Sequence, residues 1–299
     1  MNLTHTRRRF LKLAGLGGVV FASGLPGWAS AARRSASAQD FYFVQLSDTH
    51  IGFSDPTINP DADGTLTKAV AAVNALSDAP EFVVFTGDLT HSTDDPVERR
   101  KRLMQFRDIA AGLKVKDVKF MPGEHDAALD RGKAFGEFFG ATHYTFDHKG
   151  LHFIALDNVS DPAALIGDEQ LQWLAADLAK LDRRQPIVVL THRPLFELYP
   201  EWDWATRDGQ KAIDLLSPFE YVTVFYGHIH QEHHHNTGKI AHHSAKSLMF
   251  PLPAPGSVPK REPVPWDVNA PYRGLGFREV DAEAKSERLS LTEYPVRRA

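Results

Sequence analysis

The amino-acid sequence predicts an α/β sandwich built as one continuous domain. Short apolar runs alternate with segments of helical periodicity along most of the chain. Neither an internal repeat nor a low-complexity linker interrupts this alternation. The chain has 299 residues, 42% of them hydrophobic, which is enough apolar material for a core of this size.

Residues 1–38 are predicted to be an export signal and are excluded from the fold. The stretch Thr6–Lys12 reads Thr-Arg-Arg-Arg-Phe-Leu-Lys and resembles a twin-arginine signal. An apolar run with five glycines follows, too short for a stable membrane span, and small residues at 29–31 and 36–38 suit cleavage. The resemblance implies a bacterial protein exported in folded form, with the twin-arginine machinery as a partner and a periplasmic or extracellular location. No stable membrane anchor is expected after processing.

The charge balance and the absence of cysteine exclude several classes of function. Outside residues 1–38 the chain carries 28 basic and 38 acidic side chains. Binding to duplex nucleic acid depends on neutralising phosphates, so duplex nucleic acid is not an expected partner. With no cysteine, disulfides, thiolate metal sites and cysteine nucleophiles are excluded.

Short apolar runs mark the expected strands. Most of them do not alternate between apolar and polar residues, which indicates strands buried on both faces. They are Phe41–Leu46, Phe82–Thr86, Val115–Met121, Leu151–Leu156, Ile187–Thr191, Tyr221–Tyr226 and Lys239–His243, and Phe277–Val280 with Arg288–Glu293 predicts a terminal hairpin.

Apolar stripes at helical spacing mark the expected helices. One runs from Thr65, the expected N-cap, to Leu76; others cover Pro96–Leu113, Arg131–Phe139 and Asp168–Arg183. Residues 251–271 hold seven of the 19 prolines and cannot form a central strand or a helix. We expect an ordered loop there, bordering the active site.

Carboxylates and imidazoles recur where the expected strands end. Sheets of α/β proteins bind ligands at the carboxyl ends of their strands. Mutual repulsion and desolvation make such a cluster unfavourable unless cations offset it. The motifs are Ser47-Asp48-Thr49-His50, Gly87-Asp88, Gly123-Glu124-His125-Asp126, His192-Arg193-Pro194 and Gly227-His228-Ile229-His230.

This donor set predicts a dinuclear metal centre. Carboxylate oxygens mixed with imidazole nitrogens suit Mn, Fe, Zn or Ni better than Ca or Mg. The ligands are too many for one ion and fit two divalent or mixed-valence transition metal ions that share a carboxylate. Two adjacent cations lower the pKa of a bridging water and clamp the attacking and leaving oxygens of a displacement at phosphorus.

The motif series, in its order and strand context from about residue 41 to residue 243, resembles the calcineurin-like metallophosphoesterases. The resemblance implies a two-sheet β-sandwich flanked by helices, in four α/β/β/α layers, for residues 39–299. It also implies a small phosphoester substrate, a phosphomono- or diester hydrolysed by a metal-bridging hydroxide.

The same resemblance implies a role for each motif residue. His125, paired with Asp126, would stabilise the phosphate or protonate the leaving group. The metal ligands would be Asp48, His50 and His230 for the first ion, Asp88 for both ions, and Glu124, His192 and His228 for the second.

Glu124 departs from the family pattern, which has Asn at this position. A carboxylate brings a negative charge and one more methylene, so it should tighten the second cation and reduce its Lewis acidity. Glu124 is then either a variant ligand in an active enzyme or the mark of an altered or lost second site. The alternative functions are a non-catalytic periplasmic metal- or phosphate-ligand binding protein, and a cyclic-nucleotide phosphodiesterase, which the opening Gln45–His50 resembles.

For four neighbouring features we expect the following roles. His91 follows Gly87-Asp88 closely enough to contact substrate. Arg193 is expected in a salt bridge, although it could bind a phosphate oxygen. His233–His235 is expected in a solvated loop, and Trp202 with Trp204 in core or rim packing.

Overall fold

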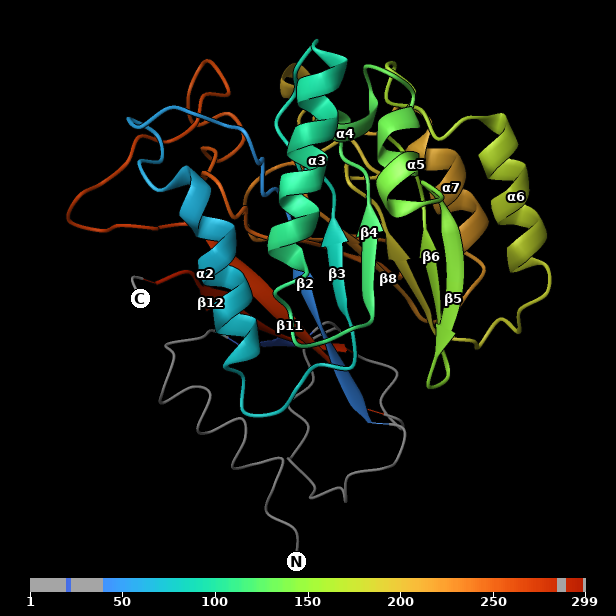
Figure 1. Cartoon of the computed structure of the whole chain (residues 1–299). Helices are drawn as coiled ribbons and strands as arrows, with labels where there is room; N and C mark the ends of the chain where they lie inside the picture. The colour runs from blue at the N-terminus through green and yellow to red at the C-terminus, as the bar shows by residue number, and fades with distance from the viewer. Residues whose placement is uncertain (1–19, 23–39, 284–288, 298–299) are drawn as a thin grey trace, which may run out of the picture.

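Two six-stranded sheets pack face to face and carry helices on their outer faces (Figure 1). The structure is a computed structural model that describes residues 20–22, 40–283 and 289–297. The four α/β/β/α layers predicted from the family resemblance are confirmed.

The first sheet has the strand order β1-β12-β11-β2-β3-β4. Strands β2, β3 and β4 run parallel, and β11 lies antiparallel to both β2 and β12. The bounds are β1 Val20–Ala22, β2 Phe41–Leu46, β3 Val83–Thr86, β4 Val118–Met121, β11 Gly276–Ala282 and β12 Leu289–Pro295.

The second sheet has the order β5-β6-β7-β8-β10-β9. Strands β6, β7, β8 and β10 run parallel, whereas β5 and β9 form antiparallel edges. The bounds are β5 Tyr144–His148, β6 Leu151–Ala155, β7 Ile187–Leu190, β8 Val222–Tyr226, β9 His233–Thr237 and β10 Ile240–Ser244.

Helices cover the outer face of each sheet. The apolar sides of α2, α3 and α5 pack on the first sheet, and those of α6 and α7 on the second. None of the helices in the described part of the chain is long and apolar enough to cross a membrane. The bounds are α2 Ala62–Asn74, α3 Pro96–Ala110, α4 Glu124–Ala127, α5 Lys133–Phe139, α6 Asp168–Leu178, the 3₁₀ helix η1 Pro200–Trp202 and α7 Gly209–Leu216.

The core has an apolar layer on each side of each sheet. In β2, Phe43 packs between the two sheets and Val44 packs under the helices, and neither side chain is exposed. Burial on both faces explains why the central strands read as continuous apolar runs. The parallel direction of these strands brings their carboxyl ends, and the motifs that follow them, to one edge of the sandwich.

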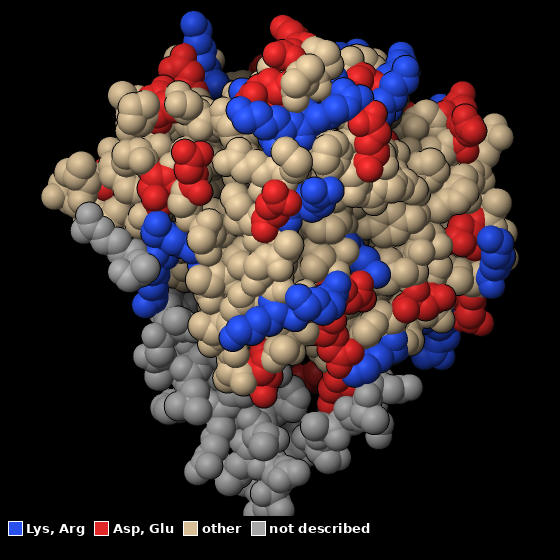
Figure 2. All heavy atoms as spheres, viewed as in Figure 1, with Lys and Arg blue, Asp and Glu red and all other residues tan. Residues whose placement is uncertain are grey.

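On the face shown in Figure 2, acidic and basic side chains are interspersed. Along α3, Arg100 Nη2 lies 2.6 Å from Glu137 Oε1 and Lys101 Nζ lies 3.2 Å from Glu98 Oε2. The basic side chains of this helix are therefore largely matched by neighbouring carboxylates.

Several element predictions need correction. Helix α2 begins at Ala62, so Thr65 is not its N-cap; the Thr65 hydroxyl donates to the Asp61 carbonyl from within the first turn. Strands β5 and β9 and helix α7 were not anticipated. His233–His235, expected in a solvated loop, belong to β9, because a turn at Gly238 (φ +61°) folds this segment back against β10.

The predicted export signal lies almost wholly outside the described residues. The twin-arginine motif Thr6–Lys12 is not among them. Residues Val20–Ala22 are, and they form the edge strand β1, which pairs with Ser290–Thr292 of β12.

A buried polar network joins the two sheets near the motif-bearing edge. Gln45 Nε2 on β2 donates to the Tyr226 carbonyl on β8, and Arg278 Nη2 on β11 donates to the Ser244 carbonyl on β10. The Arg278 Nε also donates to Glu293 on β12, and both side chains are buried. Arg278 thereby neutralises a buried carboxylate and links the sheets.

We predict that Arg278→Met lowers the free energy of unfolding by about 3–5 kcal/mol, because it leaves Glu293 buried without its main counter-charge. Urea unfolding followed by circular dichroism measures the change. The control is Arg273→Met, which removes an arginine that is 66% exposed and 3.4 Å from Asp267; it should cost no more than about 1 kcal/mol. Equal losses in the two variants would contradict the role given to the buried pair.

Candidate metal centre

The predicted metal ligands gather at the carboxyl edge of the two sheets. Their polar atoms form two adjoining groups, in each of which the candidate ligand atoms lie within 4.8 Å of one another. The first group comes from the loops after β2, β3 and β8, and the second from those after β4, β7 and β8. The members are Asp48, His50, Asp88 and His230 in the first group, and Glu124, His192 and His228 in the second.

The first group has the spacing of ligands around one ion. His50 Nε2 lies 3.1 Å from His230 Nε2 and 3.5 Å from Asp88 Oδ2, and His230 Nε2 lies 3.3 Å from Asp48 Oδ1. In a tetrahedral complex with metal–ligand bonds of about 2.0–2.1 Å, neighbouring ligand atoms are about 3.3–3.4 Å apart. The observed separations match this value closely.

The second group adjoins the first through Asp88. His192 Nε2 lies 3.3 Å from Asp88 Oδ2 and 2.8 Å from Glu124 Oε2. His228 Nδ1 lies 2.8 Å from Glu124 Oε1. Asp88 Oδ2 is thus within 3.5 Å of a ring nitrogen from each group, the position required of a carboxylate that bridges two ions.

Buried nitrogen and oxygen atoms that make no hydrogen bond indicate that each group binds a cation. Despite the short separations, His192 Nε2, Glu124 Oε2, Asp48 Oδ2 and both ring nitrogens of His228 lack a partner with hydrogen-bond geometry. A buried polar atom that makes no hydrogen bond is unfavourable by about 1–3 kcal/mol. The residues present therefore fit a pair of metal ions.

Burial also tunes two of the imidazoles toward metal binding. It lowers the pKa of His50 well below the usual value and lowers that of His228 as well. Burial opposes ionisation of Glu124, but the rings of His228 and His192 outweigh it and hold the pKa of this carboxyl well below its usual range. Burial also opposes the charge on His192, but Asp88 and Glu124 outweigh it and raise the pKa of this ring well above its usual value. Neutral imidazoles and an ionised carboxylate are the forms that bind metals, so a cation at the second group would displace a proton from His192.

Two of the rings are oriented by backbone carbonyls. His192 Nδ1 lies 2.7 Å from the Thr86 carbonyl oxygen, and His230 Nδ1 lies 2.7 Å from the Phe250 carbonyl oxygen. An Nδ1–H that donates to a carbonyl leaves Nε2 as the free acceptor aimed into the group. The contact from Phe250 also places the start of the 251–271 loop against the site.

The loops that carry the ligands are backbone-strained. A non-glycine residue in the left-handed region costs about 1–2 kcal/mol, and such residues concentrate at functional sites. Hydrogen bonds between the loops hold this geometry, including Asp48 N–H to the Gly87 carbonyl and His228 N–H to Asp48 Oδ1, each 3.0 Å. The strained ligands are Asp48, His50, Asp88, His228 and His230, with φ between +42° and +64°.

Two of the motif glycines are required because side chains of the predicted ligands lie directly against them. A Cβ atom on Gly123 would lie 2.0 Å from Asp88 Oδ1, and one on Gly87, whose φ is +93°, would lie 2.3 Å from His192 Nδ1. Neither position can accept a side chain unless a ligand moves.

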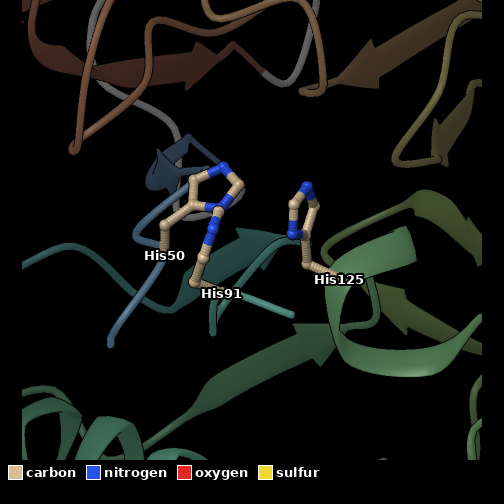
Figure 3. A group of neighbouring side chains, drawn as sticks. All are labelled: His50, His91 and His125. Carbon is tan, nitrogen blue, oxygen red and sulfur yellow. The ribbon is translucent and has the colours of Figure 1, made fainter. Parts of the chain in front are cut away.

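His125 lies at the mouth of the site. Its Nδ1 accepts a 3.1 Å hydrogen bond from the Ser92 backbone N–H and lies 2.9 Å from the Ser92 hydroxyl, while Nε2 lies 3.9 Å from Asp88 Oδ2. The ring stacks against His91 at 4.9 Å, and His91 Nδ1 lies 3.4 Å from His50 Nδ1 (Figure 3). His91 therefore contacts a predicted ligand.

The predicted pairing of His125 with Asp126 is wrong. Asp126 is buried, and its carboxylate accepts hydrogen bonds from the backbone N–H groups of Leu89, Thr90 and Gly123. It thereby joins the loop after β3 to the loop after β4. The side chain that contacts His125 is Ser92, which carries no motif signal and was not anticipated.

Two further expectations can be compared with the structure. Arg193 forms the expected salt bridge, with Nη2 2.8 Å from Asp203 Oδ2. Trp202 and Trp204 are buried and pack edge to face in the expected core role.

Comparisons with known proteins identify related sequences. The family model described as Calcineurin-like phosphoesterase matches residues 41–232. A probable cyclic nucleotide phosphodiesterase of Rhodococcus erythropolis is 28% identical over 207 residues, covering 63% of this chain and 64% of its own length. The serine/threonine-protein phosphatase CPPED1 of Mus musculus is 31% identical over 220 residues, covering 64% of this chain and 70% of its own length.

Solved structures show the same fold. A dimetal phosphatase from Danio rerio matches with a TM-score of 0.56 and 15% identity, covering 84% of this chain and 98% of its own. The purple acid phosphatase PPD1 of yellow lupin matches with a TM-score of 0.54 and 16% identity, covering 86% of this chain and 54% of its own.

We predict that Gly123→Ala releases metal without unfolding the protein, because the added Cβ would lie 2.0 Å from Asp88 Oδ1 and 2.1 Å from its backbone nitrogen and so displaces this ligand and its loop. Elemental analysis after dialysis should show less bound transition metal than in the wild type, with an unchanged circular dichroism spectrum. Gly136→Ala is the matched control: nothing lies within 4 Å of its Cβ position, so metal content should not change. Full metal content in Gly123→Ala would refute the close-approach argument.

Proposed function

The chain belongs to the calcineurin-like phosphoesterase family, and we propose that it is a metal-dependent enzyme that hydrolyses phosphomono- or phosphodiesters with two transition metal ions. The observation that carries the proposal is the pair of adjoining donor groups with Asp88 Oδ2 between them. Activities named for the relatives refer to those proteins, and the matched stretch spans 64% and 70% of the two curated relatives described.

The ligand assignment follows from the two groups. Asp48, His50 and His230 would hold one ion and Glu124, His192 and His228 the other, with Asp88 shared. When bound, two such ions supply Lewis acidity toward phosphate oxygens and lower the pKa of a shared water. Mixed carboxylate and imidazole donors favour Mn, Fe, Zn or Ni at these positions.

His125 is the side chain suited to assist departure of the leaving group. Because its Nδ1 accepts the Ser92 backbone N–H, the proton of the neutral ring resides on Nε2. That nitrogen faces the centre, 3.9 Å from Asp88 Oδ2, and the side chain is 27% exposed. The neutral ring can donate a hydrogen bond from Nε2 to a phosphate oxygen or to the leaving oxygen, whereas full protonation of the leaving oxygen requires the imidazolium form.

The cyclic-nucleotide alternative draws little support from the residues that suggested it. Gln45, at the start of the Gln45–His50 opening, is fully buried and donates to Thr86 Oγ1 and the Tyr226 carbonyl. Its role is therefore to join the sheets, and it does not bear on substrate choice. The relative from Rhodococcus erythropolis keeps this alternative as a second candidate.

We also propose a location for the enzyme. The resemblance of Thr6–Lys12 to a twin-arginine signal leads us to propose a location in the periplasm or outside the cell, with the twin-arginine machinery as a transient partner. A small phosphoester is the proposed substrate.

We predict that two variants separate metal binding from proton transfer. Asp88→Asn should lower the metal content below two ions and reduce kcat/KM for p-nitrophenyl phosphate or bis(p-nitrophenyl) phosphate by about 10²–10³-fold or more. His125→Asn should keep both ions and reduce kcat by about 10²–10⁴-fold. Elemental analysis and steady-state kinetics give the two readouts.

The wild type supplies the deciding comparison. A protein that retains two transition metal ions but hydrolyses neither aryl ester would favour the metal- or phosphate-binding alternative over the enzyme. Unchanged metal content in Asp88→Asn would show that the bridging assignment is wrong.

A further inference from the structure

Glu124 changes the charge balance of the second metal group. Two divalent ions would bring four positive charges, of which Asp48 and Asp88 offset two. An amide at position 124 would leave that balance unchanged, whereas the Glu124 carboxylate offsets a third charge. The smaller net positive charge of the centre weakens its attraction for an anionic phosphate.

A buried guanidinium lies beside this carboxylate. Arg193 directly follows His192 in the loop after β7, and its side chain is 8% exposed. Its Nε lies 3.9 Å from Glu124 Oε2. Both atoms are buried and neither has a hydrogen-bond partner, so the guanidinium and the carboxylate face each other directly.

The far side of the guanidinium is fixed by the loop at residues 203–205. Arg193 Nη2 lies 2.8 Å from Asp203 Oδ2, and Nη1 donates to the carbonyls of Asp203 at 3.0 Å and Ala205 at 3.4 Å. Buried Trp202 and Trp204 anchor this loop in the core. Because three contacts occupy the terminal nitrogens, Nε is left to face Glu124.

We propose that Arg193 is the counter-charge and positioning residue of Glu124. Its permanent positive charge offsets much of the Glu124 charge, because its other partner, Asp203, is 57% exposed and therefore more strongly screened by water. Its fixed position also orients the carboxylate, so that Oε1 faces His228 and Oε2 faces His192, each at 2.8 Å. The inference rests on the proposed dinuclear centre and accounts for an active enzyme with Glu124.

The two single substitutions should act in opposite directions on the second ion. Glu124→Gln removes an anionic ligand and leaves Arg193 near the cation, so the second Mn²⁺ should bind more weakly. Arg193→Met removes the nearby positive charge, so the second Mn²⁺ should bind as tightly or more tightly while inorganic phosphate inhibits less. The double variant restores the balance and should recover phosphate inhibition relative to Arg193→Met.

The test is a double-mutant cycle on the full chain. Isothermal titration of chelator-stripped protein with Mn²⁺ gives the second dissociation constant, and inhibition by inorganic phosphate gives the anion affinity. We expect the effect of Arg193→Met on each constant to differ by at least about 10-fold between the native and Glu124→Gln backgrounds. Circular dichroism confirms folding, and Arg193→Lys shows whether charge alone suffices.

The control is Arg99→Met, which removes an arginine whose side chain is also 8% exposed and pairs with Asp130. Its effects should be the same in both backgrounds. Equal effects of Arg193→Met in both backgrounds, in a wild type that binds two Mn²⁺ and hydrolyses an ester, would overturn this inference alone. A wild type that binds no second Mn²⁺ would overturn the proposed function with it.

Discussion

The structure depends on the need to neutralise carboxylates and imidazoles that are gathered out of water. Asp48, Asp88 and His192 are essentially unexposed, yet their polar atoms converge within a few ångströms. Burying a charged group costs free energy, and so does burying a polar atom that makes no hydrogen bond. The left-handed backbone of five ligands adds strain, which hydrogen bonds between the loops must support. Two bound cations would offset these unfavourable contributions together. Metal binding would therefore stabilise the carboxyl edge of the sheets as well as supply its chemistry.

The sandwich supplies the framework for this convergence. Parallel strands in both sheets end at the same edge, so ligands from loops more than a hundred residues apart meet there. The sheets are held in register beside the site by a buried polar network around Gln45 and Arg278. Glycines such as Gly87, whose Cβ position lies 2.3 Å from His192 Nδ1, then let the loops of the two sheets approach closely.

The sequence predicted the strands that are buried on both faces, and it did not predict β5 and β9, edge strands whose side chains are partly exposed. Strands such as β2 and β7 are buried on both faces and show as apolar runs, whereas the edge strand β9 is mostly histidine and carries no apolar pattern. The motifs predicted which ligands lie together. They could not identify the partner of His125, because Ser92 reaches the ring through loop geometry that no sequence spacing encodes.

The same limit explains why Glu124 taken alone suggests lost function. In the sequence it is an extra negative charge at a ligand position, and Arg193 is only a cation adjacent to another ligand. In the structure the loop carrying Asp203 fixes Arg193 so that its free nitrogen faces Glu124. A buried carboxylate with a buried arginine beside it reduces the attraction for phosphate less than an unpaired carboxylate would. The electrostatic argument for a non-catalytic binding protein is therefore weaker, and we interpret Glu124 as a proposed metal ligand whose charge Arg193 offsets.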